Sequence, residues 1–332
     1  MKKYLFFWLF VLFTACSHQQ TVERISVQLD TVHNSLFTRF PGSLLIFNDY
    51  IILGDPFAEK GFVKIFQRHT GAEINAIGII GKGQNECLSP DFMNYFQDHL
   101  VLYDFELNKK ALIPIDSLIH SKNNPVHLTS VPVSNIHSLI QTGDDEYVAA
   151  DYLQPLPFHL IRGEQTTATF GKNPVDEDVN TFTQGQMSYH PLRKIFVYTD
   201  NRNPYIALYK RDGTSFSFEW ECQIKTPHYR VYDNAIHWER EQPSGIMDAT
   251  FSKDYIVCLL NELKIREVNG REIDTAPKAI YLFDYDGQLV KILDLPVPAI
   301  RIASAIDSNV IYIVELEPDY DIVKCDLSSY GL

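Results

Sequence analysis

A short phrase that recurs six times along the chain is the feature that most constrains its fold. Each copy consists of a polar turn, an apolar run and a closing polar residue, and residues 97–104 form the clearest one. The closing residues lie at 55, 104, 151, 200, 261 and 315, so the copies are spaced by 49, 47, 49, 61 and 54 residues. A period of about fifty residues with a β-rich run in each unit is typical of β-propeller blades.

We therefore predict an all-β fold, a six-bladed β-propeller with four-stranded antiparallel blades. The innermost strand, A, is expected before the phrase in each unit, at 43–47, 92–96, 136–141, 184–189, 246–251 and 300–305. The phrase is strand B, and strands C and D form a hairpin, most clearly around Asp286-Gly287. The last unit ends before a strand D, so the alternating segment 24–30 is expected to close the ring. A large β-sandwich is the alternative, but it predicts no such period.

The first fifteen residues have the organisation of a lipoprotein signal peptide. Lys2 and Lys3 precede a ten-residue apolar run that is too short to span a bilayer comfortably. Phe13-Thr14-Ala15-Cys16 resembles a bacterial lipobox, which implies cleavage before Cys16 and acylation of its sulfur. We expect a signal peptide at 1–15, a lipidated tether at 16–23 and the propeller at 24–332, with the protein on the outer membrane facing the periplasm. An ordinary cleaved signal that leaves a free Cys16 is the alternative.

The charge and the cysteines exclude some classes of function. The net charge is −13, and loss of the two lysines of the signal peptide makes it −13 − 2 = −15, so no nucleic-acid partner is expected. None of the five cysteines has CxxC spacing, so neither a zinc site nor a redox motif is indicated. Cys258 is expected to be buried in a strand, whereas Cys87 and Cys222 could pair with each other.

The long connections of the predicted propeller fall on one face. The B–C and D–A connections share a face, and it would carry 225–245 and 262–278 as well as the shorter 174–181 and 201–204. Long loops on one side of a repeat array usually mark its binding face. The predicted ligand-binding residues combine aromatic rings with cationic groups: Tyr229, Arg230, His237, Trp238, Arg240, Arg266, Arg271 and Arg202. They would suit a protein, carbohydrate or anionic partner, although such loops could also vary neutrally or pack on their own blade.

Four acids close B strands on this same face: Asp55, Asp104, Asp151 and Asp200. A ring of carboxylates around a channel could hold Ca²⁺, but such an Asp more often begins a turn by accepting backbone N–H bonds. We predict no cofactor. No HExxH, GxSxG or P-loop motif occurs, the catalytic residues are unknown, and an enzyme is less expected than a binding protein. A propeller hydrolase or lactonase-like enzyme with a divalent metal in the channel is the alternative.

One loop carries a resemblance to a known family. Gly81-Lys82-Gly83-Gln84-Asn85-Glu86, followed by Ser89-Pro90-Asp91-Phe92, resembles the G-x-G-P-G-E motif of the TolB-like six-bladed β-propeller lipoproteins of Bacteroidota, with Gln84-Asn85 in place of Pro-Gly. The resemblance implies the propeller fold and an envelope location, and it carries over no catalytic residue. The loop could equally be one that its glycines shape as it enters the second blade. We predict an envelope-anchored, non-catalytic binding or protein-interaction module.

Overall fold

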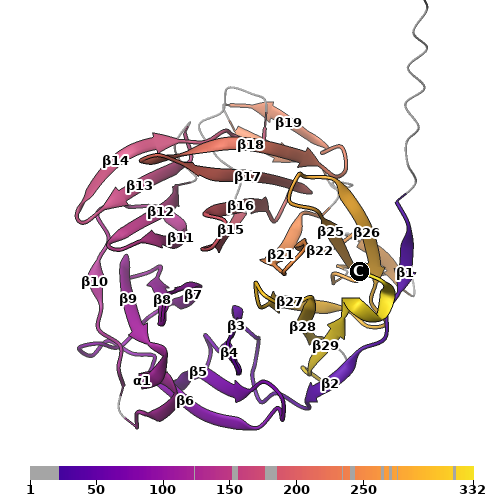
Figure 1. Ribbon diagram of the computed structural model, residues 1–332. Helices are drawn as coiled ribbons and strands as arrows, with labels where there is room; N and C mark the ends of the chain where they lie inside the picture. Colours follow the sequence, from indigo (N-terminus) through magenta and orange to yellow (C-terminus); the bar gives the residue numbers. More distant parts are fainter. Residues whose placement is uncertain are drawn as a thin grey trace, which may run out of the picture.

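Six β-sheets stand around a central axis as the blades of a propeller (Figure 1). The computed structural model describes residues 22–332 apart from 123, 152–155, 176–184, 234, 240–243, 263–264, 269–270, 275 and 317–318, and the side chains of 93, 265–268 and 271–274 also lie outside the description. Every blade is built around four antiparallel strands, which follow one another from the axis outward. The predicted fold class is confirmed.

The strands of the first three blades follow chain order without interruption. Blade 1 comprises β3 (Leu44–Phe47), β4 (Tyr50–Gly54), β5 (Lys60–Gln67) and β6 (Glu73–Ile79). Blade 2 comprises β7 (Pro90–Phe96), β8 (His99–Asp104), β9 (Lys109–Pro114) and β10 (Thr129–Ser130), with helix α1 (Ile115–His120) between the last two. Blade 3 comprises β11 (Ile136–Gly143), β12 (Glu146–Asp151), β13 (Phe158–Arg162) and β14 (Gln165–Phe170).

The last three blades carry the insertions and the closure. Blade 4 comprises β15 (Gly185–His190), β16 (Ile195–Asp200), β17 (Tyr205–Asp212) and β18 (Ser215–Gln223). Blade 5 comprises β21 (Ile246–Phe251), β22 (Ile256–Leu260), β25 (Ala279–Phe283), β26 (Leu289–Asp294) and β1 (Arg24–Ser26). Blade 6 comprises β27 (Ala299–Ser304), β28 (Val310–Glu315), β29 (Ile322–Asp326) and β2 (Asp30–His33), and the short helix η1 (Leu327–Tyr330) ends the chain. All six innermost strands begin and end within two residues of their predicted positions.

The N-terminal segment closes the ring, but not with the residues that the sequence predicted. The closing strand is β2, which pairs antiparallel with β29, whereas residues 24–26 form β1 and pair in parallel with β26 of blade 5. Arg24 explains the difference, because its guanidinium binds both Asp294 and Glu262 at 2.6 Å and so holds β1 on blade 5. The predicted strand at 24–30 is therefore two strands that serve two blades.

The turns between the first two strands of each blade show why the phrase recurs. Two-residue turns join β3 to β4 and β7 to β8, and the first turn residues, Asn48 and Gln97, have φ of 50° and 53°. Asp145 and Lys194 take the same left-handed conformation, with φ of 50° and 54°, in the corresponding turns of blades 3 and 4. Asn and Asp tolerate this region better than most residues. The polar opening of the phrase is thus the turn, and the apolar run after it is the buried second strand.

The core lies between neighbouring blades. In one cluster, Phe158 of blade 3 makes edge contacts with Phe196 and Tyr209 of blade 4, at centroid distances of 5.4 Å and 5.1 Å. Burial of such rings supplies much of the packing energy between twisted sheets. No helix among the described residues is long and apolar enough to cross a membrane.

Candidate functional site

The central channel is lined by the innermost strands of all six blades. A cavity of about 320 Å³ runs along it, with side chains of β3, β7, β11, β15, β21 and β27 in its wall. Phe105 and Asn201 also line the cavity, and both lie in B–C connections. The cavity therefore reaches the face of the propeller that carries the B–C and D–A connections, which we call the loop face.

Polar side chains in the channel join each blade to the next. An innermost strand is the inner edge of its sheet, so half of its amides lack a strand partner and need another acceptor. Asp248 of blade 5, for example, accepts a hydrogen bond from the backbone N–H of Ile302 in blade 6 at 2.9 Å. The other interfaces are spanned by these bonds: Ser43 Oγ to Asp91, the Asn94 side chain with the Gln141 backbone, Met187 N to Ser138 Oγ, Ser188 Oγ to Ala249 O, and Arg301 Nε to Gly42 O.

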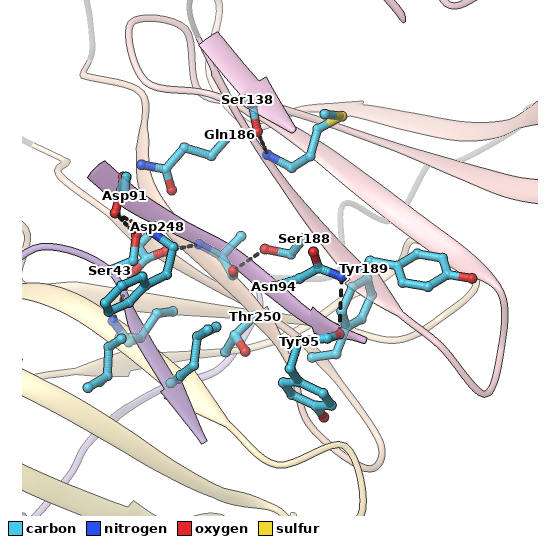
Figure 2. Close-up of a pocket in the computed structure, with 18 of the residues that line it drawn as sticks. Ser43, Asp91, Asn94, Tyr95, Ser138, Gln186, Ser188, Tyr189, Asp248 and Thr250 are labelled. Carbon is cyan, nitrogen blue, oxygen red and sulfur yellow. Dashed lines mark hydrogen bonds between the residues drawn. The ribbon is translucent and has the colours of Figure 1, made fainter. Parts of the chain in front are cut away.

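Two carboxylates stand out in this ring. Figure 2 shows Asp91 and Asp248 close together with Ser43 at one end of the pocket. Asp91 accepts hydrogen bonds from the Ser43 hydroxyl at 2.7 Å and from its neighbour's N–H, and Asp248 accepts one from the N–H of Ala249 at 2.9 Å besides that of Ile302. Burial raises the pKa of Asp91, and burial raises the pKa of Asp248 to about 6, in both cases against the lowering effect of Arg301. The hydrogen bonds and the charge of Arg301 therefore offset the cost of burying each ionised carboxylate only in part.

A buried histidine lies in the same channel. His137, on β11, lines the cavity, and burial lowers its pKa to about 4. The imidazole is therefore neutral at physiological pH and adds no positive charge beside the carboxylates.

Arg301 connects the two carboxylates to the rim of the loop face. Its guanidinium lies 5.6 Å from the centroid of the Phe40 ring and donates to the carbonyl oxygens of Gly42 and Ile300. Phe40 in turn contacts Tyr320 edge-on at 6.5 Å. Arg39, the neighbour of Phe40, covers the ring of Phe57 at 5.1 Å. These contacts lead from the channel to the half-buried ring of Tyr320 on blade 6 and to the exposed rings of Phe40 and Phe57.

The two long connections form hairpins on the loop face, as their positions predicted. The 225–245 connection contains β19 (Tyr229–Tyr232) and β20 (Ala235–Trp238), and the 262–278 connection contains β23 (Ile265–Val268) and β24 (Arg271–Asp274). Lys225 donates to the backbone oxygen of Glu262 at 3.3 Å, so the two insertions meet at their bases.

Several predicted ligand-binding residues contact one another on the β19–β20 hairpin. Tyr229 packs edge-on against Trp238 at 5.5 Å, and His237 stacks on Tyr232 at 3.4 Å. Arg230 forms an ion pair with Glu239 at 2.8 Å. The rings of Tyr229, His237 and Trp238 and the guanidinium of Arg230 therefore contact partners within the hairpin itself.

The remaining predicted residues are dispersed. Arg202 follows β16, where its backbone N–H donates to Asp200 at 2.8 Å. Arg266 and Arg271 lie on β23 and β24, but their side chains fall outside the description, and Arg240 and Cys16 lie outside the described residues. The predicted signal peptide at 1–15 and most of the 174–181 connection are outside it as well.

The four acids at the ends of B strands bind groups within their own blades. Asp104 accepts from the backbone N–H of Leu88, Ser89 and Leu107, and Asp200 accepts from those of Arg202 and Asn203. Asp55 pairs with Lys64 at 2.7 Å, and Asp151 lies 3.7 Å from His159. None of the four lines the channel cavity. Within the part of the chain that the structure describes, no three His, Cys, Asp or Glu residues are grouped so that they could hold a metal ion.

The Gly81–Glu86 loop is shaped by contacts within itself. The Glu86 carboxylate accepts the backbone N–H of Gly83 at 2.7 Å, and a Cβ on Gly81 would lie 2.1 Å from that carboxylate. The glycines thus make room for Glu86 at the entrance to blade 2.

Cys87 and Cys222 are both free, and they lie in different core clusters, so they do not pair with each other. Cys258 is buried in β22, as predicted.

Sequence reasoning identified the loop face but missed the channel. Asn94, Ser138, Ser188 and Asp248 lie on predicted A strands, and Asp91 directly precedes the strand predicted at 92–96. The signal was a polar residue within or beside each of these strands, which the search for motifs and long loops did not use.

Comparisons with known proteins agree with the fold. No family model and no curated protein matches the chain. Among solved structures, an exported protein from Bacteroides fragilis is similar with a TM-score of 0.58 and 9% identity, over 91% of this chain and 98% of that one. A member of the DUF4221 family from Bacteroides vulgatus has a TM-score of 0.55 and 9% identity, over 90% and 98%. The Swd1 β-propeller domain from Myceliophteria thermophila has a TM-score of 0.50 and 11% identity, over 86% and 82%. At these identities the likeness shows a shared fold, and the six-bladed, all-β propeller is the conclusion that sequence, structure and comparisons share.

Proposed function

We propose that the protein is an exported, envelope-anchored lipoprotein that acts as a non-catalytic protein-interaction module through its loop face. The lipobox at Cys16 and the resemblance to TolB-like propeller lipoproteins support the location. The similar Bacteroides fragilis protein, described as exported, agrees with it.

The distribution of exposed apolar side chains carries the proposal. Of the eleven large hydrophobic residues that are exposed in the described part of the chain, six lie in B–C or D–A connections and only Leu192 lies in a turn of the opposite face. The six are Phe37, Phe40, Phe57, Phe105, Leu156 and Tyr232. Soluble proteins rarely gather such residues on one face unless a partner covers them. A protein partner fits this surface better than the anionic ligand considered above, because the exposed side chains gathered on it are apolar.

The direction of the first strand supports an orientation in which this face is turned away from the membrane. β1 runs parallel to β26, which leads into the D–A connection, so the chain approaches the propeller from the side opposite the loop face. Residue 22 already packs on the core, and Glu23 accepts the N–H of Ile292 at 3.1 Å. The residues from Cys16 to the first of these contacts span about 20 Å when fully extended. A lipid on Cys16 would therefore leave the loop face open to a partner.

Photo-crosslinking in the native envelope tests the proposal. A crosslinking amino acid is placed at Tyr232 or Phe57 on the loop face, and at Leu192 on the opposite face as the matched exposed control. We expect discrete protein adducts from Tyr232, from Phe57 or from both, and none from Leu192. Adducts of equal yield from Leu192, or no adduct from either loop-face position, would contradict the proposal.

A further inference from the structure

Exposed phenylalanine rings of the loop face lie on the connections around blade 1, and Phe40 packs on Arg301, which lies beside the channel carboxylates. Phe37 is 96% exposed, Phe57 54% and Phe40 40%, and all three belong to the connection into blade 1 or to the B–C connection of blade 1. Arg39 links Phe40 to Phe57, and Phe105 of blade 2 reaches into the channel wall. We call Phe37, Phe40, Phe57 and Phe105 the phenylalanine rim.

Two carboxylates give the channel mouth a negative charge that blade-to-blade bonding does not require. At the interfaces of blades 2 with 3, 3 with 4 and 4 with 5, the bonding side chains are neutral: Asn94, Ser138 and Ser188. Among the bonds described above, carboxylates serve at Asp91 and Asp248, and the positive charge of Arg301 acts on both of them. When both acids are ionised, Asp91, Asp248 and Arg301 together have a charge of −2 + 1 = −1 beside the exposed phenylalanine rings.

Arg301 is not available to neutralise both acids fully. It donates to two backbone carbonyls, at 2.8 Å and 2.7 Å, and packs on Phe40. Burial opposes ionisation of both carboxylates, so a cation that entered the mouth would interact with them in a poorly solvated site. The net charge of −13 for the whole chain would also favour the approach of a basic partner.

We propose that the phenylalanine rim and the channel mouth together bind an apolar segment of a partner protein, with a lysine or arginine side chain of that segment inserted between Asp91 and Asp248. This inference rests on the proposed function and names its partner class. Apolar residues of the segment would cover Phe37, Phe40 and Phe57, and the cation would pair with the carboxylates. The cavity of about 320 Å³, at the lower end of the size of ligand pockets, has room for a lysine or arginine side chain.

The partner segment captured from position 57 tests the inference. Full-length protein with the crosslinker at Phe57 is irradiated in the envelope, and the attached peptide is sequenced. We expect apolar residues and a Lys or Arg within a few positions of the attachment point. A segment without a basic residue, or a lipid adduct, would overturn the inference. Adducts from Tyr232 but not from Phe57 would overturn it and leave the proposed function standing, whereas no adduct from either would overturn both.

A synthetic peptide with the captured sequence then tests the ion pair. Its affinity for the full-length protein in detergent should fall about tenfold or more with Asp91→Asn plus Asp248→Asn, and by a similar factor when its basic residue is replaced by norleucine. The two changes together should cost little more than either alone. Phe57→Ser should also weaken binding, and Leu192→Ser should not. Additive losses, or unchanged affinity of the norleucine peptide, would overturn the inference even if the Asp variants fold poorly.

Discussion

Asp248 should make the stability of the propeller depend on pH in a defined way, and its replacement by Asn should remove that dependence. Burial raises the pKa of this carboxyl from 3.8 to about 6, so the folded state binds its proton more tightly than the unfolded state does. Unfolding therefore releases a proton between pH 4 and 6, and stability falls as the pH rises through this range. A difference of 6 − 3.8 = 2.2 pKa units corresponds to about 3 kcal/mol.

The assay is urea unfolding of the wild type and of Asp248→Asn from pH 4 to pH 8. Asn keeps one acceptor for the N–H groups of Ala249 and Ile302, and Asp91 and Arg301 remain in both proteins. The free energy of unfolding of the wild type, relative to the variant, should decrease by about 2 kcal/mol between pH 4 and pH 7, because part of the full effect lies below pH 4. Asp326→Asn is a control of opposite sign, because hydrogen bonds from Ser328 lower the pKa of Asp326. A difference between wild type and Asp248→Asn that did not change with pH would refute the reasoning.

Three further outcomes are expected. Glu146→Gln should cost about 2–3 kcal/mol of unfolding free energy at pH 7, because the buried Glu146 binds Arg162 of its own blade and Arg211 of blade 4. The partial exposure of both arginines keeps this cost below the usual penalty for breaking a buried ion pair. Urea unfolding measures the cost, and an unchanged unfolding midpoint would contradict the prediction. Cys16→Ala should move the protein from the membrane fraction to the soluble or unprocessed pool, and continued labelling by a palmitate probe would rule out Cys16 as the acylated residue. Deletion of 22–33 should expose the edge of β29, lower the melting temperature and cause aggregation visible by light scattering, so an unchanged melting curve would argue against closure by β2.

The sequence allowed the fold to be predicted because each blade repeats the same local chemistry. A left-handed turn at Asn48, Gln97, Asp145 or Lys194 is followed by a fully buried strand, and both parts leave a mark in the sequence. The N-terminal strand was misplaced for the opposite reason. Outer strands are half exposed and weakly patterned, and the division into β1 and β2 depends on the ion pairs of Arg24 with residues about 240 or more positions away.

The side chains that line the channel could not be identified from the sequence, although their polar character on predicted strands could be read from it. A polar residue such as Asp248 within Ile246–Phe251 is ordinarily read as one that faces solvent on an alternating strand. Its actual partners are the N–H of Ala249 beside it and that of Ile302, which lies on the next blade. Only closure of the ring brings that edge amide and the aspartate together, so the geometry is set by the tertiary structure.

The N-terminal segment combines closure of the ring with the proposed attachment to the membrane. A lipid on Cys16 would pull on the chain immediately before β1, and β1 is the strand that its pairs with Asp294 and Glu262 hold on blade 5. Val27 follows β1 in the chain and is buried between blades 5 and 6, and the closing strand β2 comes after it. β2 is also packed against blade 1, where His33 bonds the carbonyl oxygen of Gly71 at 2.8 Å and a Cβ on Gly71 would meet the Val32 oxygen at 1.8 Å. Tension on the tether would thus act first on β1 and Val27, and the seam between blades 6 and 1 would stay closed until both had detached.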